Sequence, residues 1–199
     1  MSTNPQSTTD RSDLPRTLIG GAVAGMAAAM AMAMFAMVAS VTYQHHGFFT
    51  PLFHISALVE SPKAMMISVQ QAMDGHRFWF TPGAALAGLM VHMVTGAMFG
   101  VAFAVIARAV PRRVLVVAGA LYGLGVFVIA SFVFLPIAAA VTGSGTTISH
   151  MGQMVGWSTF AIEHMMFGIA LGAILSATAA RSKGSSNAVA SDRRPRVAL

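Results

Sequence analysis

The chain has 199 residues, of which 56% are apolar and only 9% are charged, with a formal net charge of +6. Soluble domains carry about 25% charged residues, so this composition predicts a membrane protein. The chain has no cysteine, which excludes disulfides, thiolate chemistry and cysteine-based metal sites.

The N-terminal residues 1–16 are polar and rich in Ser, Thr, Asp and Pro, so we expect a disordered tail. Four apolar segments follow, and each is longer than the ~20 residues that a helix needs to cross the bilayer. These segments are residues 17–43, 82–107, 114–136 and 155–180. Their many Gly and Ala residues suit helices that pack closely in lipid.

The segments between and after these helices differ in character. Residues 44–81 form a long outer loop, in which residues 64–71 are expected to form a short helix on the membrane surface. Pro111 marks a tight inner turn, and residues 137–154 form a second outer loop rich in Gly, Ser and Thr. Residues 181–199 are basic, and we expect a disordered C-terminal tail.

The basic residues are distributed unevenly along the chain. Most of them lie in three places, which are the N-tail (Arg11, Arg16), the inner turn (Arg108, Arg112, Arg113) and the C-tail (Arg181, Lys183, Arg193, Arg194, Arg196). This positive-inside pattern places both termini in the cytoplasm. It also explains the net charge without nucleic acid, which we do not expect as a partner. The expected partner is the lipid bilayer, and a homo-oligomer or a partner in a membrane complex stays open.

Two motifs occur twice in the chain. The pattern H-M-x-x-G-x-x-x-G occurs at residues 92–100 and 164–172, and G-A-x-x-G occurs at residues 21–25 and 119–123. The sequence therefore predicts an all-α membrane protein, a four-transmembrane-helix antiparallel bundle that is built from a parallel duplicated helical hairpin.

Glycines four residues apart lie on one helix face and let two helices approach closely. One such pair is found in each span, and the pairs are Gly21/Gly25, Gly96/Gly100, Gly119/Gly123 and Gly168/Gly172. All of them fall in the expected inner half of the membrane, which predicts a bundle that is tight inside and looser outside. We accordingly expect Gly88→Leu to disturb the bundle less than Gly96→Leu or Gly168→Leu.

Ionisable residues occur within two of the spans. His92 and His164 are expected at a similar depth in the outer half of the membrane, and Glu163 is the only acidic residue in any span. Such groups are costly in lipid unless they are paired, hydrated or bound to a ligand. We therefore expect all three to line a ligand-binding pocket that opens outward between the second and fourth spans.

Three interpretations of these residues stay open. In the leading one, the pocket binds a small ligand, a proton or a metal ion, with His92, His164, His150 and Met154 as candidate metal ligands. In the second, His92 and His164 ligate haem b for electron transfer. In the third, the histidines only link helices in a structural or assembly protein. The leading interpretation requires no resident cofactor. The chain carries no catalytic motif, so we expect no enzymatic activity and no catalytic residues.

Part of the chain is similar to the YagU-like family of uncharacterised bacterial inner-membrane proteins. The similar features are the stretch from His92 to Pro111, then Gly119–Gly123, Pro136 and a closing helix with a mid-span His164. The resemblance covers about residues 85–175 and does not include the methionine-rich first helix. It implies a small, multi-pass protein of the bacterial plasma membrane, and it transfers no catalytic residue.

Overall fold

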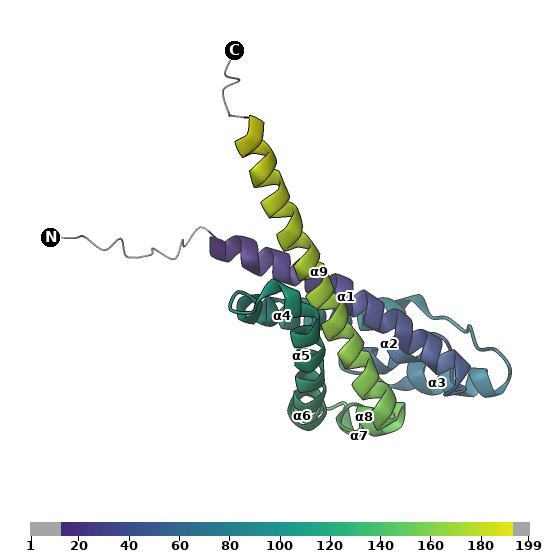
Figure 1. Ribbon diagram of the computed structural model, residues 1–199. Helices are drawn as coiled ribbons and strands as arrows, with labels where there is room; N and C mark the ends of the chain where they lie inside the picture. Colours follow the sequence, from purple (N-terminus) through teal and green to yellow (C-terminus); the bar gives the residue numbers. More distant parts are fainter. Residues whose placement is uncertain (1–12, 193–199) are drawn as a thin grey trace, which may run out of the picture.

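The structure, a computed structural model, describes the backbone of residues 13–192 and the side chains of residues 14–178. This part of the chain is helical, with no strand (Figure 1). Most of the expected N-tail and the last seven residues of the expected C-tail lie outside the described residues. The elements are α1 (Asp13–Thr42), α2 (Thr50–Ser56), α3 (Lys63–Met73), α4 (Pro82–Ala107), η1 (Arg112–Val114), α5 (Leu115–Ile129), η2 (Ala130–Phe134), α6 (Leu135–Thr142), α7 (Gly145–Ser149), α8 (Met151–Val155) and α9 (Trp157–Asp192).

The four apolar helices expected from the sequence are present and long enough to cross a membrane, which confirms this part of the prediction. They cover Leu14–Thr42, Pro82–Ala107, Arg112–Thr142 and Trp157–Thr178. Large apolar side chains on their outer faces are exposed, including Val94 at 70% and Leu121 at 66%. Such faces are suited to contact with lipid chains.

The third span is longer than the sequence predicts. It was expected to end at Pro136, but it continues through the π-helical turn η2 and then through α6 to Thr142. Pro136 lies in the first turn of α6, where a missing N–H costs little because the preceding π turn already interrupts the regular bonding pattern.

The last helix is also longer than expected. The sequence predicts a flexible tail from residue 181, whereas α9 continues to Asp192. This segment contains Gly184 and several Ser residues, which favour helix only weakly, so its sequence alone does not account for the extension.

Glycines bring the spans together in two antiparallel pairs. In the pair α1–α4, a Cβ atom on Gly25 would lie against the carbonyl oxygen of Gly96 and 2.8 Å from the Cα atom of Gly100. In the pair α5–α9, a Cβ atom on Gly119 would lie against the carbonyl oxygen of Gly168 and 3.2 Å from Gly172 Cα. Only glycine allows two backbones to approach this closely.

The two pairs meet where α9 crosses α1 (Figure 1). This central contact is made of small residues on α1 and large ones on α9, since Ala24 and Ala28 pack with Phe167 and Leu171 in one buried cluster. The spans are thus ordered α4, α1, α9 and α5, with α1 and α9 in the centre and only a slight contact between α4 and α5.

The two pairs do not share the same register. Gly25 and Gly123 occupy the same place in the repeated motif, yet Gly25 faces Gly96, whereas Gly123 faces the backbone of His164. The glycine that corresponds to Gly96 is Gly168, which lies one turn beyond His164. The second pair is therefore shifted by about one helical turn, and the two histidines meet different surroundings.

The long loop of residues 44–81 folds over the ends of α1 and α4 that it connects. The short helix expected at residues 64–71 is confirmed as α3, whereas α2 was not expected. A Cβ atom on Gly88 would clash with the backbone of Leu52 in α2. This contact argues against the expectation that Gly88→Leu disturbs the bundle less than Gly96→Leu or Gly168→Leu, because Gly88 makes a close backbone contact of its own.

Candidate functional site

A cavity of about 310 Å³ lies between the glycine contacts and the loop of residues 44–81. The sequence predicted a pocket between the second and fourth spans, but residues from all four spans and from α2 and α8 line this cavity. Its walls are mainly apolar and include the aromatic rings of Phe99, Phe134, Phe160 and Phe167. An apolar cavity with a few polar groups is typical of small-molecule sites, and this volume is near the lower end of their range of about 300–1,000 Å³.

Glu163 on α9 is one of the polar groups in this wall and is only 4% exposed. Within the part of the chain that the structure describes, no hydrogen bond or ion pair reaches its carboxyl group. Its oxygens are not sealed inside the protein, because Ser131 Oγ is the one fully buried side-chain polar atom without a partner among the described residues. The carboxyl group of Glu163 therefore faces the cavity.

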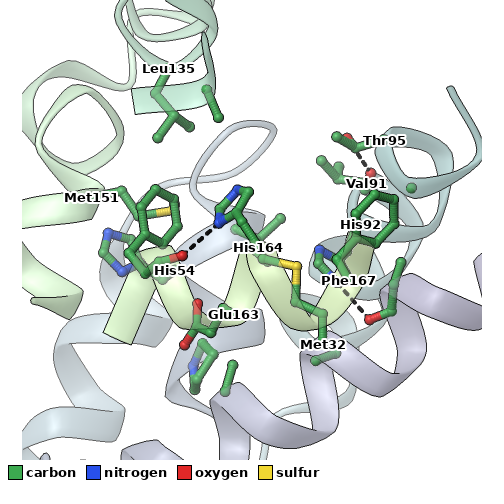
Figure 2. Close-up of a pocket in the computed structure, with 18 of the residues that line it drawn as sticks. Met32, His54, Val91, His92, Thr95, Leu135, Met151, Glu163, His164 and Phe167 are labelled. Atoms are coloured by element: carbon green, nitrogen blue, oxygen red, sulfur yellow. Dashed lines mark hydrogen bonds between the residues drawn. The ribbon is translucent and has the colours of Figure 1, made fainter. Parts of the chain in front are cut away.

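His164 also lies on α9 and lines the same cavity. Its Nδ1–H group donates a hydrogen bond of 2.7 Å to the carbonyl oxygen of Phe160, one turn earlier in the helix (Figure 2). The ring packs edge-on against the rings of Phe160 and Phe127, with centroid distances of 4.4 and 6.0 Å. These contacts fix the orientation of the imidazole and leave Nε2 without a partner among the described residues.

His92 reaches the cavity from α4. Its Nε2–H group donates a hydrogen bond of 2.9 Å to the carbonyl oxygen of Ala29 on α1, as Figure 2 shows. His92 therefore links two spans, whereas His164 bonds only within its own helix. The difference agrees with the shifted register of the two helix pairs.

His54 on α2 is a fourth ionisable residue of the cavity, and the sequence placed it only in an outer loop. It is 5% exposed, and its Nε2–H group donates a hydrogen bond of 2.7 Å to the carbonyl oxygen of Thr147 on α7. Burial lowers the pKa of His54, and nearby His46 lowers it further, although the hydrogen bond to Thr147 acts in the opposite direction. The available signal was Pro51, because proline favours the first turn of a helix.

A second hollow of about 360 Å³, the vestibule, adjoins the cavity and shares Gln44, Pro51, His54 and Val155 with it. His46 lines the vestibule but not the cavity. Its pKa is lowered mainly by burial and further by the charge of nearby His45. Gln44 donates a hydrogen bond of 2.8 Å to Val155 O, which joins the end of α1 to the segment before α9. The vestibule thus continues the cavity toward the outer loops.

The candidate metal ligands do not come together. His92 and His164 line the cavity, Met154 lines the vestibule, and His150 is exposed and bonds to Ser149 Oγ at 3.0 Å. Among the described residues, no group of three or more His, Asp or Glu side chains is close enough to hold a metal ion. Figure 2 shows the reason in part, since Glu163 and His164 leave α9 in different directions.

Ligation of haem b by His92 and His164 stays a prediction that this arrangement does not favour. Imidazole usually binds iron through Nε2, but Nε2 of His92 already donates to Ala29 O. A haem would have to break this hydrogen bond between the two spans.

Comparison with protein families, with curated proteins and with solved structures finds no match for this chain. The resemblance to the YagU-like family therefore stays a prediction.

Proposed function

We propose that this chain is a non-enzymatic, multi-pass protein of the bacterial plasma membrane, with both termini in the cytoplasm, and that it binds a small, largely apolar molecule in the cavity. The observation that carries the proposal is the carboxyl group of Glu163, which faces the cavity without a partner among the described residues. An unpaired ionisable group within a membrane span is costly and is typically kept for function.

The shape of the site supports binding from the outer side. The cavity continues into the vestibule, which lies among the outer loops, whereas glycine contacts close the helix pairs on the other side. The basic residues of the inner turn and tails support the same orientation.

Binding is tested with three probes that share a benzene ring on a two-carbon chain, which are phenethylammonium, 2-phenylethanol and 3-phenylpropionate. Each is added to the purified protein in nanodiscs, and binding to empty nanodiscs is subtracted. We expect saturable binding of at least one probe.

Filling the cavity provides the matched comparison. Ala33 lines the cavity, whereas Ala31 lies on the same helix and is exposed on its outer face. Ala33→Phe should weaken binding by about tenfold or more, because the added ring occupies the site, and Ala31→Phe should not. The absence of saturable binding, or equal affinities in the two variants, would contradict the proposed function.

A further inference from the structure

Most polar atoms that remain free in the cavity are hydrogen-bond acceptors, and the exception is the second amide N–H of Gln44 at the border with the vestibule. A carbonyl oxygen only accepts, so the ring nitrogen that bonds to it must carry the proton, and the other nitrogen of a neutral imidazole holds a lone pair. His54 donates to Thr147 O, His92 to Ala29 O and His164 to Phe160 O. Each ring therefore presents a free lone pair, and the carboxylate of Glu163 adds two acceptor oxygens.

In the described part of the chain, the cavity is lined by an acidic residue but by no basic side chain of the Lys or Arg type. Glu163 is the only acidic residue that lines the cavity, and no Lys or Arg lines the cavity or the vestibule among the described residues. Ionisation of Glu163 in this apolar, membrane-embedded site would be favoured by a positive partner, and this chain does not supply one among the described lining residues.

Resting on the proposed function, we propose that the ligand is a small organic ammonium ion with an apolar body. Its N–H groups bind the Glu163 carboxylate, and its apolar body occupies the space between the aromatic walls. Phe99, Phe134 and Phe160 line the same space, and their ring faces attract a cation in a site from which water is largely excluded.

Other ligand classes fit less well. An anion would meet mainly acceptors and the acidic Glu163, with the second amide N–H of Gln44 as a single donor among the described residues. A bare metal ion needs several ligands at about 2 Å, and the described His and Glu side chains are too widely spread for this. An organic ammonium ion does not need a closed set of ligands, because one charge-assisted hydrogen bond to Glu163 is combined with burial of its apolar body in the cavity.

The three probes test this inference because they differ chiefly in the head group. In the unmodified protein at pH 7, phenethylammonium should bind at least about tenfold more tightly than 2-phenylethanol, and 3-phenylpropionate should bind most weakly. This ranking needs no variant, so it tests the inference even if substitution of Glu163 prevents folding.

The matched variants are Glu163→Gln and Glu60→Gln, since Glu60 is exposed and lines neither the cavity nor the vestibule. Glu163→Gln should weaken binding of phenethylammonium by about tenfold or more and leave binding of 2-phenylethanol nearly unchanged, whereas Glu60→Gln should affect neither.

The outcomes separate the two proposals. If 2-phenylethanol binds as tightly as phenethylammonium, and Ala33→Phe still abolishes binding, the ammonium inference is overturned and the proposed function stands. The inference is also overturned if Glu163→Gln retains the full affinity for phenethylammonium. If no probe binds saturably, the proposed function itself fails.

Discussion

His92 connects two membrane spans through one hydrogen bond, from its ring on α4 to the Ala29 carbonyl on α1. Polar links between membrane helices contribute about 0.6 kcal/mol on average and up to about 1.7 kcal/mol. His92→Leu should therefore lower the free energy of unfolding by about this amount. His92→Gln should lower it less, because the amide retains a donor. Unfolding of the protein by SDS in mixed micelles measures the difference, and equal losses in both variants would contradict a role for the hydrogen bond.

His54 gives the stability a predictable dependence on pH. Its pKa in the folded protein lies below the ordinary value of 6.5, so the folded state favours the neutral ring. Stability from His54 is thus fully present above pH 6.5 and is lost as the pH falls toward the lowered pKa. The pKa of His46 is also lowered, so His46 contributes a loss of stability in the same pH direction. Glu163 and His164 are the other ionisable groups that share the cavity with His54, together with His92.

The contribution of His54 is isolated by substitution. Between pH 8 and pH 5, the melting temperature of the unmodified protein should fall more steeply than that of His54→Gln, because glutamine does not titrate. Parallel pH curves for the two proteins would show that His54 has no such effect.

Two glycines of α5 lie close together in the sequence but have different surroundings. Gly123 on α5 faces the backbone of His164 on α9, whereas a Cβ atom on Gly125 would meet nothing within 4 Å. Overpacking a tight contact typically costs about 1–3 kcal/mol. Gly123→Leu should cost at least this much in the free energy of unfolding, and Gly125→Leu should cost little.

The pair α1–α4 offers the same comparison. Gly21 packs against Gly100 and Ala104, and the adjacent Gly20 has open space. Gly21→Leu should therefore be much more damaging than Gly20→Leu, as judged by SDS-induced unfolding. Similar losses at Gly20 and Gly21 would contradict the close approach of these helices.

The elements that the sequence predicts well are those defined by long apolar runs. The expected range 82–107 coincides with α4, because Pro82 starts the helix and basic residues follow its end. Helix α2 could not be predicted in this way, because seven residues do not form a stable helix alone. It depends on packing instead, as the full burial of Phe53 shows. The extension of the third span was missed because Pro136 normally ends a helix.

Part of the candidate site could also be predicted from the sequence. Ionisable residues within apolar runs stand out, which identified His92, His164 and Glu163 as candidates. His54 did not stand out, because it lies in a loop whose depth depends on how α2 packs on α4. The repeated motifs predict equivalent surroundings for His92 and His164. They do not reveal that the second helix pair is shifted by about one turn relative to the first.

The four spans together form a protein that is closed by glycine contacts on one side and hollow on the other. The central helices α1 and α9 contribute to both parts, since their glycines lie at one end and their cavity-lining residues toward the other. This division accounts for a cavity that opens toward the outer loops. If it is correct, a water-soluble reagent should enter the cavity from the outer side only.

Labelling of single cysteines tests this access most directly, because the natural chain contains no cysteine. Ala36→Cys places a thiol in the cavity, and Ala31→Cys places one on the exposed apolar face of the same helix. Each variant is treated with a membrane-impermeant trimethylammonium thiosulfonate, in spheroplasts and in inverted vesicles. We expect rapid labelling of Cys at position 36 in spheroplasts, slow labelling in inverted vesicles, and slow labelling at position 31 in both. Equal labelling at the two positions, or labelling of position 36 only in inverted vesicles, would contradict an outward-facing cavity.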